Sequence, residues 1–123
     1  MDKSPRWLVE LFDALQPEVG GSRRIMFGFP TAFENGQLFT GLFQDTMFVR
    51  LGERDRAALL AEKGATQFAP MNGRPMKEYV VLPASMLEDE DAVRSWMRRG
   101  FDYARSLPPK KKKASPGARR RSA

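Results

Sequence analysis

The sequence contains neither histidine nor cysteine. Their absence excludes serine–histidine–aspartate triads, cysteine–histidine dyads, the common zinc sites and any disulfide framework. Catalysis would have to use carboxylates, lysine, tyrosine or a bound cofactor. We therefore expect a protein that is not an enzyme and that holds no metal and no cofactor.

The chain also lacks an apolar run of about 18 residues, the length that a membrane-spanning helix needs. Its first residues, Met1-Asp2-Lys3-Ser4-Pro5, contain no apolar stretch of the kind found in signal peptides. We therefore expect a cytoplasmic protein without membrane contact. With 123 residues, the chain has room for one well-packed domain.

Acidic residues are missing from the C-terminal end, so the net charge of +6 is unevenly distributed. Residues 109–123 hold seven of the 21 basic residues, which leaves 14 basic against 15 acidic residues in the rest. The seven are Lys110, Lys111, Lys112, Lys113, Arg119, Arg120 and Arg121. We predict a domain over residues 1–108 and a disordered basic tail over 109–123, because the tail's composition offers almost no apolar surface to bury.

The basic tail is the candidate nucleic-acid contact. Clustered lysine and arginine side chains neutralise phosphates and release counterions, which favours DNA or RNA of any sequence. No aromatic residue interrupts the tail, so we expect neither base stacking nor sequence readout from it. The alternative is an extension that only adds solubility or non-specific adhesion.

Two amphipathic helices are predicted at the ends of the domain. The first has Ser4 as its N-cap, Pro5 at its first position, and an end at Pro17 and Gly20-Gly21. Its apolar face consists of Trp7, Leu8, Leu11, Phe12 and Leu15. The last begins around 88–91, and its apolar side consists of Val93, Trp96, Met97, Phe101, Tyr103 and Ala104. We expect both tryptophans to be mostly buried against a sheet.

Most of the sequence between these two helices has the residue pattern of β-strands. Residues 24–51 predict three or four antiparallel strands in a meander, with a hairpin turn at Asn35-Gly36, where both positions favour positive φ. A helix over 54–63, ended by Gly64, and two strands over 67–70 and 76–83, joined by a turn at 72–75, complete the domain.

Several of these segments together resemble the N-terminal domain of the TfoX/Sxy competence regulators. The matching pieces are Arg24-Ile25-Met26-Phe27-Gly28, Asn35-Gly36-Gln37-Leu38-Phe39, Asp45-Thr46-Met47-Phe48-Val49-Arg50, Gly64 ahead of Gln67-Phe68, Met76-Lys77-Glu78-Tyr79 leading to Pro83, and a closing helix with Trp96 and Ala104. The resemblance covers roughly residues 5–107. Phe29-Pro30 departs from it, standing where the family usually has a second glycine and an aromatic residue.

The resemblance implies a two-layer α+β fold, similar to that of type III secretion chaperones. A curved antiparallel sheet of about five strands would carry helices on one face. The full-length regulators of this family act in natural competence together with the cyclic-AMP receptor protein, and the longer members carry a second, C-terminal domain. We expect the basic tail in its place here, so the resemblance does not carry the role of the full-length regulators over to this sequence. The resemblance transfers no catalytic residues.

Five smaller groups of residues are candidate sites, each with a structural alternative. Gly20-Gly21-Ser22-Arg23-Arg24 suits a phosphate or a plain linker, and Met26-Phe27-Gly28 suits a ligand-facing element or a core strand with a turn. Glu88-Asp89-Glu90-Asp91 suits a divalent cation or the helix dipole. Arg50, Lys77, Glu78 and Tyr79 suit a polar site or cross-strand pairs. Arg94, Arg98, Arg99 and Arg105 suit an extension of the tail's binding surface or a solvated helix face.

Three functions remain open at this point. The first is an interaction module that binds another protein, with the tail near nucleic acid. The second is a small-molecule-binding or enzymatic domain that uses the concave side of the sheet, which an apolar pocket with converging polar groups would favour. The third is a homodimer joined through an exposed edge strand, as opposed to a monomer.

Overall fold

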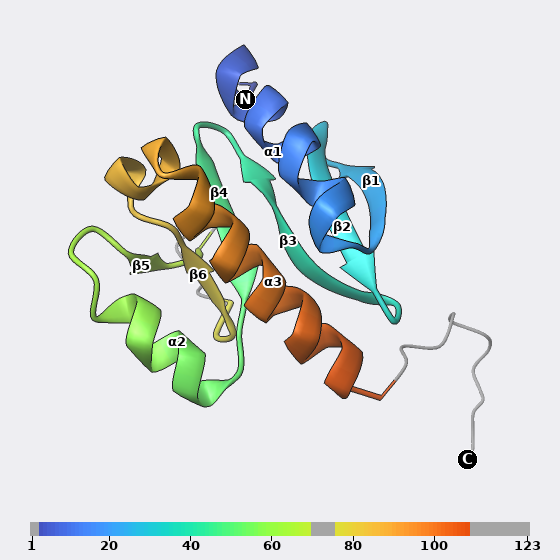
Figure 1. The fold of residues 1–123 in the computed structure, drawn as a ribbon, viewed down its shortest axis with the longest axis vertical. Coiled ribbons are helices and arrows are strands. Elements are labelled where there is room, and N and C mark those ends of the chain that lie inside the picture. Colours follow the sequence, from blue (N-terminus) through green and yellow to red (C-terminus); the bar gives the residue numbers. More distant parts are fainter. Residues whose placement is uncertain (1–2, 70–75, 109–123) are drawn as a thin grey trace.

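The computed structural model describes residues 3–69 and 76–108 (Figure 1). In chain order its elements are α1 (Arg6–Val19), β1 (Ser22–Met26), β2 (Phe29–Glu34), β3 (Gln37–Phe43), β4 (Thr46–Arg50), α2 (Glu53–Leu60), β5 (Thr66–Gln67), β6 (Tyr79–Val81), the 3-10 helix η1 (Ala84–Glu88) and α3 (Glu90–Ser106). The strands form one antiparallel sheet in the order β1-β2-β3-β4-β6-β5. The predicted α+β fold is therefore confirmed, with six strands in place of about five.

The first four strands form the predicted meander, and each of its three turns has two residues. Asn35 and Gly36 have φ of 61° and 73°, as the prediction of a primed hairpin turn requires. Phe27 and Gly28 form a second such turn between β1 and β2, with φ of 55° and 84°. A bulge between Ala32 and Phe33 shifts the register of β2 against β3.

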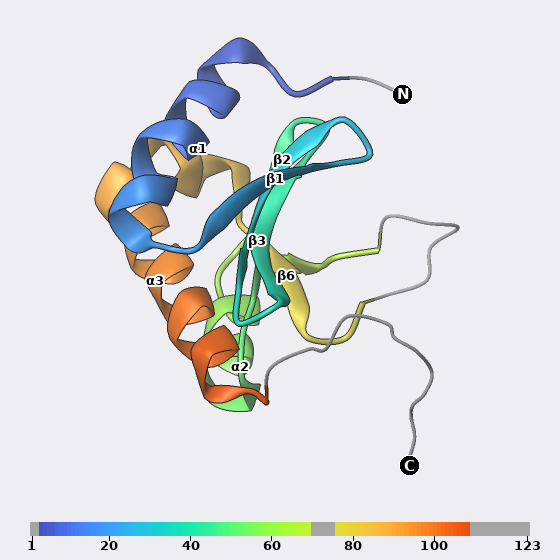
Figure 2. The same cartoon turned by 90° about the vertical axis from the view of Figure 1, so that its right-hand side faces the viewer.

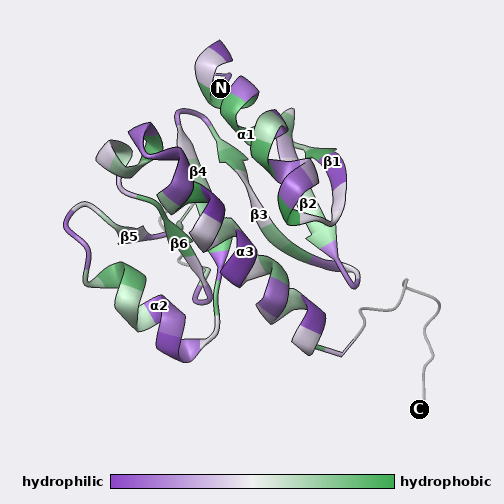
Figure 3. Ribbon diagram, viewed as in Figure 1, coloured by the Kyte–Doolittle hydropathy of each residue, from purple (hydrophilic) through white to green (hydrophobic). Residues whose placement is uncertain are grey.

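Helices α1 and α3 cover one face of the sheet, and no helix of residues 3–69 and 76–108 covers the other (Figure 2). The N-cap of α3 is Asp89, whose side chain accepts a hydrogen bond from the Ala92 amide. Hydrophilic and hydrophobic residues alternate along α3 (Figure 3), because its inner side packs on β3 and β4 while its outer side meets solvent. The core joins both helices to the sheet and includes Leu8, Phe12, Leu15, Phe39, Val49, Val93, Met97 and Ala104.

The ends of α1 differ from the sequence prediction. The N-cap is Pro5, and no side chain caps the helix, so Ser4 is not the cap. Pro17 lies inside the helix, which continues to Val19 because that residue is buried in the core. Its end is closed by the Gly20 amide, which donates to the Gln16 carbonyl at 2.9 Å.

The prediction that both tryptophans are mostly buried is wrong for Trp7, whose side chain is 53% exposed. The buried stripe of α1 runs through Leu8, Phe12, Leu15 and Val19, and position 7 lies about 100° around the helix from Leu8, at its margin. Trp96 is half-buried against the core.

The second half of the domain also differs in its element bounds. The strands predicted over 67–70 and 76–83 are reduced to the short β5 and β6, and η1 was not predicted. The helix predicted over 54–63 ends at Leu60. The turn predicted at 72–75 lies outside the described residues.

Candidate functional site: an aromatic groove on the open face of the sheet

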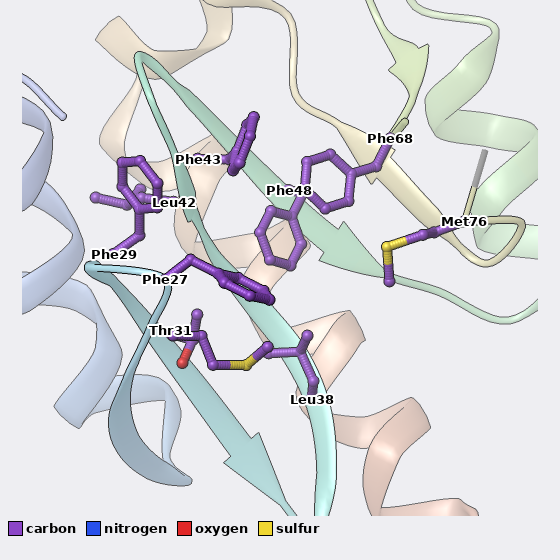
Figure 4. Close-up of a pocket in the computed structure, with 10 residues that line it drawn as sticks. Phe27, Phe29, Thr31, Leu38, Leu42, Phe43, Phe48, Phe68 and Met76 are labelled. Carbon is purple, nitrogen blue, oxygen red and sulfur yellow. The ribbon is translucent and has the colours of Figure 1, made fainter. Parts of the chain in front are cut away.

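An apolar groove of about 290 Å³ lies on the face of the sheet that carries no helix (Figure 4). We call it the aromatic groove. It is lined by Met26, Phe27, Phe29, Thr31, Leu38, Leu42, Phe43, Phe48, Phe68 and Met76. These residues come from β1 to β4, from the turn between β1 and β2, and from the chain that flanks β5 and β6.

The floor of the groove follows from the strand register. Thr31, Gly41 and Phe48 are direct neighbours across β2, β3 and β4, so their side-chain directions share one face. A Cβ atom at Gly41 would lie 2.7 Å from Thr31 Cγ2 and 2.9 Å from Phe48 Cζ. Only glycine at this position lets the Phe48 ring lie across β3.

The walls are held by contacts between aromatic rings. Phe48 and Phe68 stack with their centroids 4.3 Å apart and their planes 16° apart. Phe43 meets Phe68 edge-on at 5.7 Å and meets Phe29 at 5.3 Å. Such pairs stabilise beyond the area they bury, so the groove is a packed feature of the folded sheet.

Phe27 is the most unusual residue of the groove. Its ring lies near that of Phe48 in Figure 4, yet 71% of the residue is exposed. Its positive φ places a bulky side chain in the left-handed region, which costs a non-glycine residue free energy. A large apolar side chain held in an unfavourable conformation and in solvent has no evident role in folding, which points to a role in binding.

The groove offers almost no polar chemistry. Thr31 is the one polar residue among the described residues that line it, and its hydroxyl already donates to the Arg24 carbonyl at 2.9 Å. No converging donors or charged groups could orient a polar substrate there. The groove therefore suits an apolar group and no evident reaction.

A polar cluster fastens β4, β6 and α3 to one another. The Arg50 guanidinium donates to Glu78 at 2.7 Å and 2.8 Å and to Gln37 Oε1 at 2.9 Å. The Tyr103 hydroxyl donates to the other Glu78 oxygen at 3.0 Å. Arg50 also lies 5.5 Å from the Tyr79 ring centroid and 5.7 Å from that of Tyr103. The cluster joins residues far apart in the sequence and so stabilises the packing of α3 against the sheet.

The Glu78 carboxyl feels opposing influences. Partial burial disfavours its charge, but the hydrogen bonds from Arg50 and Tyr103 outweigh that effect and hold its pKa below the ordinary value of 4.5. Burial, reinforced by the Glu78 carboxylate, raises the pKa of the Tyr103 hydroxyl, which therefore stays a donor at neutral pH.

The Glu78→Gln variant should lose about 1 kcal/mol of stability at pH 7. The expected loss is smaller than is usual for a hydrogen bond to a charged group, because the Glu78 side chain is 34% exposed and water screens its charge. Since the folded-state pKa is lowered, the contribution is complete above pH 4.5 and is lost as the pH falls through the folded value. Urea unfolding from pH 7 to pH 3 should show the two proteins converging. A difference that stays constant over this range would contradict the assignment.

The comparisons with known proteins give one match. The model of the TfoX N-terminal domain family matches residues 12–104. The chain belongs to this family. Searches of curated proteins and of solved structures found no significant match. The resemblance noted in the sequence is thus confirmed, and the segments that carried it frame the groove: Met26-Phe27 at its rim and Phe48 on its floor.

In this TfoX N-terminal domain, Gly20-Gly21 links α1 to β1, while Ser22, Arg23 and Arg24 belong to β1 and form no phosphate cradle. Gln16 Nε2 donates to the carbonyls of Gly20 and Gly21, both at 3.1 Å. Arg23 pairs with Asp13 of α1 at 2.8 Å, and the Arg24 guanidinium lies 4.8 Å from the Phe33 ring centroid. The two arginines point to different partners and do not converge.

The acidic start of α3 is occupied by structural contacts. Asp89 caps the helix, while Glu90 and Asp91 pair with Arg94 at 3.7 Å and 2.6 Å. Over residues 3–69 and 76–108, no three acidic side chains gather as a metal site would need. Within the same ranges, no helix is long and apolar enough to cross a membrane.

The arginines of α3 have partners within the domain. Arg94 also pairs with Glu18, Arg99 pairs with Asp55 at 3.2 Å, and Arg105 lies 3.9 Å from Glu34. Arg98 reaches the Glu18 carbonyl at 3.4 Å. The helix face is therefore largely neutralised. The candidate nucleic-acid residues Lys110–Lys113 and Arg119–Arg121 lie outside the described residues.

The predicted cross-strand pairing of Arg50 with Glu78 and Tyr79 agrees with the structure. The Lys77 side chain takes no part in this cluster, and the Lys77 carbonyl accepts a hydrogen bond from Gln67 Nε2. Sequence reasoning named Met26-Phe27-Gly28 as a possible ligand-facing element but did not predict the rest of the aromatic groove. The signal was present in Phe39-Thr40-Gly41-Leu42-Phe43 and Met47-Phe48-Val49, where apolar residues do not alternate with charged ones. Such runs indicate a sheet with two apolar faces, of which the helices cover only one.

Proposed function

We propose that this TfoX N-terminal domain is a non-enzymatic protein-interaction module whose aromatic groove receives an apolar anchor side chain of a partner protein. The exposed and conformationally strained Phe27 at the rim of the groove is the observation that carries this proposal. Aromatic residues around an apolar pocket are typical of the few positions that dominate the energy of a protein interface.

The proposal explains features that an enzymatic role would leave unexplained. The groove has an apolar lining without converging polar groups, and the polar cluster of Arg50 and Glu78 is fully used in joining secondary-structure elements. The basic tail would add a second, electrostatic contact to nucleic acid, and would thereby hold the module and its partner near DNA or RNA.

Photo-crosslinking tests the role of the groove. A benzoylphenylalanine at position 27 should link to a partner protein in cells, whereas the same group at Trp7 should not. Trp7 is the matched control because it is also a large, exposed aromatic residue but lies on α1, which covers the opposite face.

Titration with the purified partner protein then measures how much Phe27 contributes to the binding affinity. The Phe27→Ser variant should bind about thirtyfold more weakly, as expected for an interface position worth 2 kcal/mol. The Trp7→Ser variant should stay within about threefold of the wild type. Equal binding by Phe27→Ser and the wild type would remove the groove from the interface.

A site for a small apolar molecule is the second candidate, and the groove volume favours it. About 290 Å³ is roughly twice the volume of an engineered apolar cavity that holds benzene. Native mass spectrometry of the purified chain distinguishes a small bound molecule from a partner protein as the occupant of the groove. A bound apolar compound that is absent from Phe27→Ser, together with crosslinking at position 27 that yields no protein, would favour the small molecule.

A further inference from the structure

Strand β1 is a free edge of the sheet beside the aromatic groove. It is the outermost strand at its end of the order, and it has five residues, whereas β5 at the other edge has two. Four of the five residues are exposed, and Met26 is half-buried at the rim of the groove. An edge of this length presents unpaired backbone groups to any extended segment that approaches it.

The turn fixes which backbone groups point outward. Met26 and Phe29 flank the two-residue turn, so they form a hydrogen-bonded pair, and the bonded pairs then alternate along the ladder. Arg24 consequently bonds to β2, while Ile25 and Arg23 direct their N–H and C=O groups to the free edge. Pro30 opposite Ile25 agrees with this pattern, because a non-bonded pair needs no N–H from the proline.

The side chains of β1 divide between the two faces. Arg24 lies opposite Thr31 and shares the open face with Met26, whereas Arg23 reaches Asp13 on the helical face. Within residues 3–69 and 76–108, Arg24 has no carboxylate partner. An uncompensated guanidinium therefore lies two residues from the apolar rim.

From this arrangement we infer that an extended segment of the partner protein adds to β1 as a seventh strand. The inference rests on the proposed interaction function and specifies the partner's chemistry. The segment would exchange backbone hydrogen bonds with Arg23 and Ile25. On the open face it would place an acidic side chain opposite Arg24 and a large apolar one opposite Met26, in contact with Phe27. The recognised pattern is thus an acidic and a large apolar residue separated by one position.

A second copy of this chain fits the same edge less well. If the β1 strands of two copies pair antiparallel along all five residues, the middle residue Arg24 of one copy lies directly opposite Arg24 of the other. Like charges in that position destabilise a strand pair. A strand with an acidic residue there replaces the repulsion with attraction.

Selection of random heptapeptides on the immobilised full chain tests the inference. Enriched peptides should carry the acidic and apolar residues two positions apart. Ile25→Pro removes an N–H that points away from β2, so the sheet should tolerate it, but synthetic enriched peptides should bind at least tenfold more weakly. Arg24→Glu should weaken them about threefold and shift a fresh selection towards basic residues, an effect that misfolding cannot produce.

The outcomes separate this inference from the proposed function. Enriched peptides that depend on Phe27 but bind Ile25→Pro as well as the wild type would overturn strand addition and leave the groove proposal standing. Failure to enrich any peptide that depends on either position would count against both. A wild-type dimer in analytical ultracentrifugation that becomes a monomer in Ile25→Pro would show that a second copy takes the edge, which also overturns the inference.

Discussion

The Phe39→Ala variant should lose about 3–5 kcal/mol of folding stability, the range expected when a large aromatic core residue is truncated. Phe39 is fully buried between the sheet and α3, and its ring meets that of Phe101 edge-on at 5.6 Å. Gly21 also packs closely against this ring. Removal of the ring leaves a cavity that rigid backbone on both sides cannot close. A domain with a total stability of 5–15 kcal/mol would lose a large fraction of it.

Urea unfolding followed by tryptophan fluorescence measures this loss as a lower midpoint with an unchanged slope. Phe27→Ala is the matched control, because it removes the same atoms from a side chain that is mostly in solvent, and it should stay within about 0.5 kcal/mol of the wild type. A loss below 1 kcal/mol for Phe39→Ala would mean that α3 does not pack on β3 as described. Equal losses in the two variants would contradict the contrast between core and groove.

The parts of the fold that local chemistry determines were predictable. Asn35-Gly36 specifies a primed turn because both residues tolerate positive φ, and the helical spacing of Leu8, Phe12 and Leu15 specifies one face of α1. The parts decided by tertiary contacts were not. Burial of Val19 carries α1 past Pro17, and the margin of the buried stripe leaves Trp7 in solvent although its residue type favours burial.

The site was less predictable than the fold for the same reason. Met26-Phe27-Gly28 was recognised as a candidate, but its apolar sequence suited a core strand equally well. The turn places Phe27 outside the core, and that becomes visible only when the register sets Met26 opposite Phe29. The groove further depends on Phe68, which comes from beside β5 and stacks on Phe48 of β4 across the sheet. No local pattern connects these two residues.

Deletion of Lys110–Ala123 should abolish binding to nucleic acid. The deletion removes seven positive charges, and the remaining domain carries 14 basic against 15 acidic residues. The arginines of α3 already have partners within the domain, as Arg94 with Glu18 and Arg99 with Asp55 show. If all seven charges contact phosphates on duplex DNA, the logarithm of the binding constant should fall with the logarithm of salt at a slope of about −6; partial engagement would give about −3 to −5.

Titrations of both chains with duplexes of unrelated sequence, at two salt concentrations, check this expectation. The full chain should bind them with similar, weak affinity, because phosphate contacts carry no base information. The deletion should leave stability within about 0.5 kcal/mol, since it spares Leu107 and Pro108, whose carbonyls accept hydrogen bonds from Asn35 and Gln37. A truncated chain that binds as tightly as the full one would contradict the assignment of the tail. The arginines of α3 would then become the candidate nucleic-acid contact, at the cost of the ion pairs that now hold them.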